Sequence, residues 1–110
     1  MTYDEFVNIA LERPDTKESV ERDNLSVNRA GKSMFWLKKG ELLCIKLNWS
    51  IHDLMLAKYP KVLYKTPHFD GYPALHANLE LLTTELAKEL VSHSWEDAPN
   101  KVKFRRQPKS

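Results

Sequence analysis

The chain has 110 residues, of which 42% are apolar and 29% are charged, and its formal net charge at pH 7 is +2. This composition excludes collagen-like, disordered and disulfide-rich classes, and the length suits one domain with its own hydrophobic core. A net charge this small indicates no particular partner. We therefore expect a single domain over residues 1–110, with a short basic tail from about residue 100.

Cys44 is the only cysteine, so an intrachain disulfide is impossible and a reducing compartment is indicated. The N-terminal segment carries Asp4 and Glu5 where a signal peptide would carry cations. No apolar run in the sequence approaches the roughly 20 residues that cross a bilayer. These observations predict a cytoplasmic protein.

Helix signals occur in three segments, each with a capping residue at its start and a proline after its end. Inside each segment, apolar residues recur at the 3.6-residue spacing of an amphipathic helix. The predicted helices run over about 3–12, where Thr2 and Glu5 match a capping box; from a capping signature at Ser50 to the stop at Pro60; and over about 84–96, capped by Thr83.

Elsewhere the apolar spacing changes to the two-residue period of β-strands, within residues 19–47 and near residues 62–64 and 74–79. The segment Lys38-Lys39-Gly40 suits a three-residue hairpin loop, which pairs Phe35 with Leu43. The expected element order is α-β-β-β-β-α-β-β-α. It defines an α+β fold with a single antiparallel sheet and helices packed on one face.

The hairpin register predicts which strand side chains face the helices and which face away from them. Phe35, Leu37, Leu43, Ile45 and Leu47 are expected on the helix side. The opposite face is expected to expose Ser26, Asn28, Met34, Trp36, Leu42, Cys44, Lys46, His76 and Asn78.

An exposed tryptophan beside Lys and His can stack on bases and contact phosphate, as in sheets that bind single strands. The candidate nucleic-acid-binding residues are therefore Trp36, Lys38, Lys39, Lys46 and His76, together with Lys101, Arg105 and Arg106 of the basic tail. The tail or a second subunit could equally cover the apolar part of this face, and a small ligand is a further alternative.

No catalytic or metal-binding motif occurs in the sequence, since G-x-S-x-G, H-E-x-x-H and a glycine-rich phosphate loop are all absent. His52 is expected to face solvent, and His68 and His76 flank Asp70 without the further donors that a metal requires. Cys44 is expected to be a packed thiol, because no neighbouring base would activate it. We expect no enzymatic activity, no cofactor and no bound metal.

Several short segments resemble the MmcQ/YjbR family of small bacterial proteins over nearly the full chain. They are the helix start Thr2-Tyr3-Asp4-Glu5-Phe6, the turn Ala30-Gly31-Lys32 with Met34-Phe35, the segment His68 to Ala74, and the stretch Trp95 to Val102. The His68 to Ala74 segment is the most specific. Asn100 departs from the pattern, because it interrupts an Ala-Pro-Lys sequence that often closes family members.

The resemblance implies a fold similar to bacterial frataxin (CyaY-like) and a "double-wing" motif predicted to bind DNA, with no assigned catalytic residues. Our leading hypothesis is thus a non-enzymatic DNA-binding protein. The alternatives are a protein-interaction or homodimerisation module that uses the same sheet face, and a small-ligand or cation binder near His68 and the acidic N-terminal region.

Overall fold

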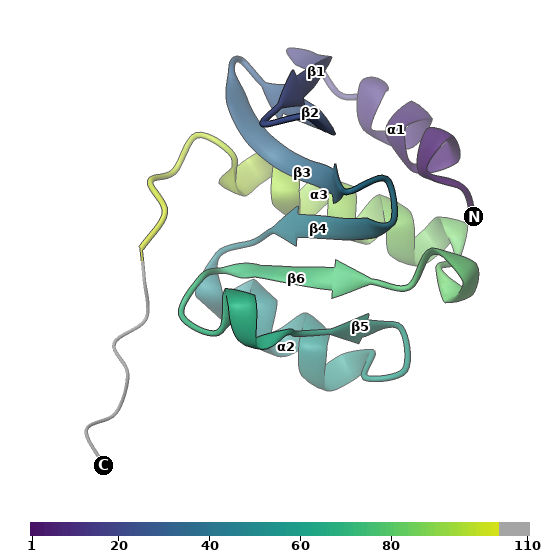
Figure 1. Cartoon of the computed structure of the whole chain (residues 1–110), viewed down its shortest axis with the longest axis vertical. Helices are drawn as coiled ribbons and strands as arrows, with labels where there is room; N and C mark the ends of the chain where they lie inside the picture. The colour runs from purple at the N-terminus through teal and green to yellow at the C-terminus, as the bar shows by residue number, and fades with distance from the viewer. Residues whose placement is uncertain (104–110) are drawn as a thin grey trace.

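The structure is a computed structural model that describes residues 1–103. Its elements run along the chain in the order α1 (Tyr3–Leu11), β1 (Thr16–Glu21), β2 (Asn24–Arg29), β3 (Lys32–Lys38), β4 (Leu42–Lys46), α2 (Trp49–Lys58), β5 (Leu63–Tyr64), η1 (Pro67–Phe69), β6 (Ala74–Ala77), η2 (Leu79–Leu81) and α3 (Thr84–Asp97) (Figure 1). The elements η1 and η2 are short 3-10 helices.

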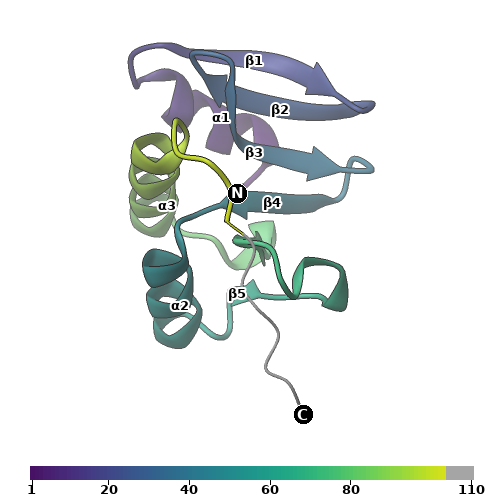
Figure 2. The same ribbon diagram turned by 90° about the vertical axis from the view of Figure 1, so that its left-hand side faces the viewer.

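The six strands form one antiparallel sheet in the order β1-β2-β3-β4-β6-β5. Figure 2 shows that α1, α2 and α3 all lie on one side of this sheet. The predicted α+β class, the element order and the placement of the helices on one face are confirmed.

Side-chain caps fix the starts of the helices. The Thr2 hydroxyl accepts from the Glu5 amide and the Glu5 carboxylate accepts from the Thr2 amide, so the predicted capping box is confirmed. Thr83 caps α3 as expected. The predicted start of α2 was wrong by two residues, because the Asn48 side chain accepts from the Ile51 amide at 3.0 Å and the helix begins at Trp49.

The hairpin register between β3 and β4 differs from the prediction by two residues. Phe35 pairs with Ile45 rather than with Leu43, because the turn is made by Lys39 and Gly40, both in the left-handed region at φ 52° and 71°. A shift of two residues keeps every side chain on its predicted face, since the side-chain period of a strand is also two.

A β-bulge in β3 changes the alternation at one point. Val27 pairs with Phe35 and Asn28 with Ser33, so Met34 is the extra residue. The Met34 side chain consequently joins the helix-side core, whereas it was expected on the opposite face. The Ser94 hydroxyl of α3 donates to the Met34 carbonyl at 2.7 Å and satisfies the backbone there.

The main core fills the space between the sheet and the helices. Phe6 of α1 meets Phe35 of β3 edge to face, with ring centroids 4.7 Å apart. The fully buried residues of this core include Phe6, Met34, Phe35, Leu43, Ile45, Leu47, Met55, Leu75 and Leu90. Within residues 1–103, no helix has both the length and the apolar character needed to cross a membrane.

Leu43→Ala tests this core, and Leu54→Ala on α2 is the matched control. Leu43 is fully buried, so its truncation is expected to lower the free energy of unfolding by about 2–5 kcal/mol. Leu54 is 57% exposed, so its truncation should change stability by less than about 1 kcal/mol. Urea unfolding of both variants measures the difference; equal losses would contradict the assignment of the core.

Candidate functional site

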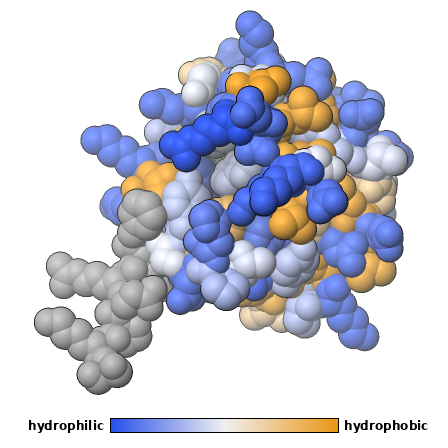
Figure 3. All heavy atoms as spheres, viewed as in Figure 1, coloured by the Kyte–Doolittle hydropathy of each residue, from blue (hydrophilic) through white to orange (hydrophobic). Residues whose placement is uncertain are grey.

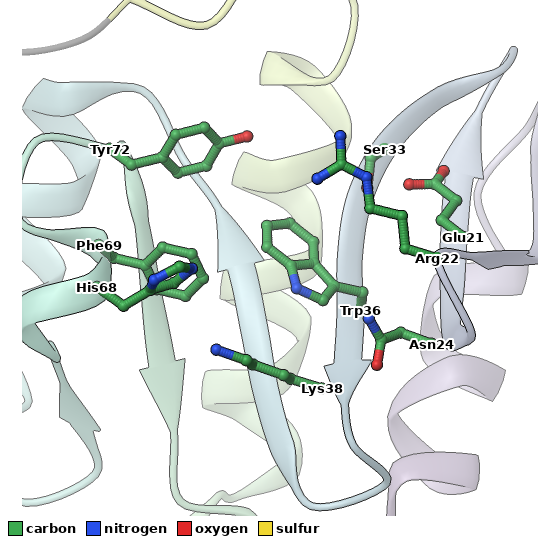
Figure 4. Close-up of a pocket in the computed structure, with 9 residues that line it drawn as sticks. All are labelled: Glu21, Arg22, Asn24, Ser33, Trp36, Lys38, His68, Phe69 and Tyr72. Carbon is green, nitrogen blue, oxygen red and sulfur yellow. The ribbon is translucent and has the colours of Figure 1, made fainter.

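A cavity of about 420 Å³ opens on the sheet face that lies away from the helices. The β1–β2 turn and β3 form one wall, and the segment 66–73 forms the other. Its lining residues, which Figure 4 shows, are Glu21, Arg22, Asn24, Ser33, Trp36, Lys38, His68, Phe69 and Tyr72. Figure 3 views the same side of the molecule and shows hydrophilic side chains around its smaller apolar areas.

Trp36 lies at the centre of this cavity. Its neighbours across the sheet are Ser26 and Cys44, and its indole is partly buried. Phe69 meets the indole edge to face, with centroids 6.0 Å apart. One part of the ring system is thus held by packing while the rest borders the cavity, which leaves a flat apolar surface for a planar ligand.

Two cations flank the indole. Lys38 extends from the end of β3, and Figure 4 shows its amino group between Trp36 and His68. Arg22 and Asp23 form the turn between β1 and β2, both in the left-handed region at φ 49° and 67°. This conformation is uncommon for residues other than glycine, and it directs the exposed Arg22 side chain over the cavity.

Lys65 stabilises the opposite wall of the cavity, which is the segment 66–73. The Lys65 amino group donates to the Tyr72 carbonyl at 2.7 Å and to the Ala74 carbonyl at 3.2 Å. It also contacts His52 Nε2 at 2.8 Å. An ammonium group can only donate, so Nε2 accepts and the His52 proton resides on Nδ1, which lies 2.9 Å from the Asp53 carboxylate.

The expectation that the whole face opposite the helices is open was wrong, because the segment 66–73 of the same chain covers part of it. Phe69 packs on Cys44 and Ala74 in a second, smaller core, and Trp36, Leu42 and Tyr72 border it. This cover removes much of the apolar surface on which the dimer hypothesis depended.

Lys46 is not available to a ligand, contrary to its predicted role. It is 6% exposed, and its amino group donates to the Ala98 carbonyl at 3.2 Å and to the Asn100 carbonyl at 3.1 Å. Burial lowers the pKa of Lys46, while Asp97 acts in the opposite direction. Lys46 therefore satisfies carbonyls at the C-terminal end of α3.

His76 is also buried, at 1% exposure, so the expectation that it faces solvent was wrong. Its Nε2 lies 3.0 Å from the Thr66 hydroxyl, and its Nδ1 lies 3.6 Å from the Cys44 sulfur. Burial lowers the pKa of His76, and the nearby cations Lys38 and Lys65 lower it further. The ring is therefore neutral at neutral pH.

The proximity of Cys44 and His76 was missed in the sequence. They lie 32 residues apart and become neighbours because β4 pairs with β6. In the sequence, the only sign of this proximity was that both side chains were predicted on the same face of the sheet. Burial raises the pKa of Cys44 to about 11, so the thiol stays protonated and is not an activated nucleophile. The predicted packed thiol is confirmed.

The remaining candidates are dispersed. Lys39 is exposed at the hairpin turn, outside the cavity, and Lys101 is exposed beyond α3. Arg105 and Arg106 lie outside the described residues.

His52 was predicted to face solvent but is 2% exposed, since it packs against Lys65 and Trp49. Within residues 1–103, no group of three His, Cys, Asp or Glu side chains could hold a metal ion.

Comparison with known proteins gives distant relatives. Three uncharacterized proteins, one from Mycobacterium bovis and two from strains of Mycobacterium tuberculosis, are each 30% identical to the chain over 88 residues. The match covers 79% of the chain and 63% of each relative, so the chain spans less than two thirds of their length. No family model and no solved structure matches the chain.

The Cys44 thiol is expected to react slowly with a disulfide reagent in the folded protein. With a pKa of about 11, only about one molecule in ten thousand carries the thiolate at pH 7, and the sulfur is fully buried. Stopped-flow absorbance in buffer and in denaturant measures both rates. A native rate close to the denatured rate would contradict the buried, protonated thiol.

His76→Asn is expected to reduce the acid sensitivity of the fold. The unfolded chain protonates His76 near pH 6.5, whereas the folded chain does so only at lower pH. The contribution of His76 to stability is therefore complete above pH 6.5 and is lost as the pH falls through and below that value. Urea midpoints at about pH 7.5 and about pH 5 measure this loss.

The variant His93→Gln, which removes a partly exposed imidazole from α3, is the control for this experiment. It should keep the pH dependence of the wild type. An equal dependence in His76→Asn and in the wild type would show that His76 does not carry the effect.

Proposed function

We propose that this chain is a non-enzymatic protein that binds single-stranded nucleic acid, DNA in the first instance, at the Trp36 cavity. The observation that carries the proposal is a partly buried indole inside a 420 Å³ cavity with a cation on each side. A base would stack on the indole of Trp36. Lys38 and Arg22 would contact the adjoining phosphates.

The energetics favour this combination of groups. Stacking of a base on an aromatic side chain contributes about 1–3 kcal/mol and tolerates any base, because every base has a flat π-surface. Phosphate contacts add an attraction that is independent of sequence and weakens as salt rises. We therefore expect binding with little sequence preference and a clear dependence on ionic strength.

Single strands fit this cavity better than duplexes do. The flat surface of Trp36 lies between the β1–β2 turn and the segment 66–73, so a base must leave its stack to reach it. The electrostatic footprint is also smaller than predicted, because Lys46 and His76 are buried. The resemblance of His68 to Ala74 to MmcQ/YjbR proteins supports the same class of function and stays a prediction.

A free small ligand is the second candidate. The cavity volume lies within the usual range of about 300–1,000 Å³ for ligand pockets. Its aromatic and cationic lining suits a planar molecule that carries negative charge. Free nucleotides and single strands share this chemistry, so the same residues would serve both.

Trp36→Leu tests the proposed function, with Tyr59→Leu, at the C-terminal cap of α2, as a control that removes an aromatic ring on the helix side. Loss of stacking is expected to weaken binding of a labelled oligothymidylate by about 5- to 150-fold. The control should bind as the wild type does. Fluorescence anisotropy gives the dissociation constants, and circular dichroism verifies that both variants fold.

Lys38→Gln, measured over a series of salt concentrations, gives a second readout of the same experiment. Removal of one phosphate contact should lower the slope of log affinity against log salt by about 0.7 for a single strand. Binding that Trp36→Leu leaves unchanged would refute the proposal.

A further inference from the structure

We propose that the Arg22 end of the cavity is a phosphate subsite, in which Arg22 and Ser33 hold the phosphate of the nucleotide whose base stacks on Trp36. This inference rests on the proposed function and adds to it the residues that fix the orientation of the nucleotide. It also predicts that a phosphorylated nucleotide, not the nucleoside, is the unit that the cavity recognises.

The first observation is a buried hydroxyl group with nothing to bind. The Ser33 hydroxyl oxygen is shielded from solvent, yet it has no hydrogen-bond partner in the described part of the chain. A buried polar group left without a partner costs about 1–3 kcal/mol. The β3 bulge places it there, because the extra residue Met34 reverses the alternation and turns Ser33 from the helix side into the cavity.

The second observation is an arginine that forms no ion pair with any residue of 1–103. Arg22 lines the same cavity as Ser33, and Figure 4 shows its guanidinium at the Ser33 end. The guanidinium presents several donors in a planar fork that matches the oxygens of a phosphate. The turn in which Arg22 and Asp23 are both at positive φ places the Arg22 backbone at this end of the cavity.

The third observation is a further donor on the opposite wall. Figure 4 shows the Tyr72 ring extending from that wall with its hydroxyl toward Arg22. Burial raises the pKa of Tyr72, while Arg22 lowers it and Glu21 raises it, so the hydroxyl keeps its proton and both charges lie within electrostatic reach of it. A phosphate at this end would therefore lie near Tyr72 of the opposite wall as well as near Arg22.

Glu21 is the opposing charge, since its carboxylate also lines the cavity. In the view of Figure 4, Arg22 lies between Glu21 and Trp36, so the guanidinium faces the indole side. Glu21 forms no ion pair with Arg22 within residues 1–103, so this carboxylate leaves the guanidinium available to a phosphate. Lys38 stands at the other end of the indole, where the next phosphate of a strand would pass.

The test compares thymidine monophosphate, thymidine and a short oligothymidylate by isothermal titration calorimetry on the full chain. The wild type is expected to bind the monophosphate at least about tenfold more tightly than the nucleoside, as a charged hydrogen bond predicts. Arg22→Gln should abolish this difference. Lys17→Gln removes the same charge from an exposed site on β1 outside the cavity and should preserve it.

Ser33→Ala provides a second, independent variant. Because the hydroxyl has no partner in residues 1–103, its removal is expected to leave the melting temperature unchanged or slightly higher. The affinity for the monophosphate should nevertheless fall by about three- to tenfold. A loss of affinity without a loss of stability separates ligand binding from a structural role.

The outcomes distinguish the subsite from the proposed function. If the oligothymidylate binds through Trp36 but Arg22→Gln behaves as Lys17→Gln does, the subsite is refuted and the function stands. If the monophosphate binds through Arg22 and the oligothymidylate does not bind, the subsite stands and the ligand is a free nucleotide. If none of the three compounds binds, both proposals are refuted.

Discussion

The contact between the segment 66–73 and the sheet determines the character of the whole second face. Phe69 covers Cys44 and Ala74, and the Lys65 amino group donates to the carbonyls of Tyr72 and Ala74. Without this cover the face would be an open, partly apolar surface suited to a dimer. With the cover it becomes a cavity lined by the partly buried indole of Trp36, and the neighbouring thiol and imidazole become interior groups.

Much of the fold could be predicted because its signals are local. Caps and apolar periodicity act over a few residues, so α1 and α3 were placed correctly. The predicted pairing of the hairpin was wrong by two residues, and it kept the predicted faces because the side-chain period of a strand is also two. The bulge at Met34 could not be predicted: it is a relation between two strands, and it exchanges the faces of Met34 and Ser33.

The candidate site was predicted in part for a related reason. Trp36 was found because alternation along one strand assigns its face, whereas Lys38 was predicted in the hairpin loop and lies at the end of β3. Lys46 and His76 lie on that face too, but their burial is due to segments distant in the sequence, namely the end of α3 and Thr66. Arg22 was not predicted, because the direction of its side chain depends on a left-handed turn that the sequence does not indicate.

Both edges of the sheet are poor templates for another strand. β5 has only two residues, Leu63 and Tyr64, and β1 carries Lys17, Glu18 and Glu21 along the other edge. Short edges and charged edges discourage the backbone pairing by which sheets join end to end. Neither edge strand is therefore suited to pair with a strand of another copy of this chain. Copies can come into contact at high concentration without their sheets joining, and neither edge offers a site at which a fibril could begin to grow.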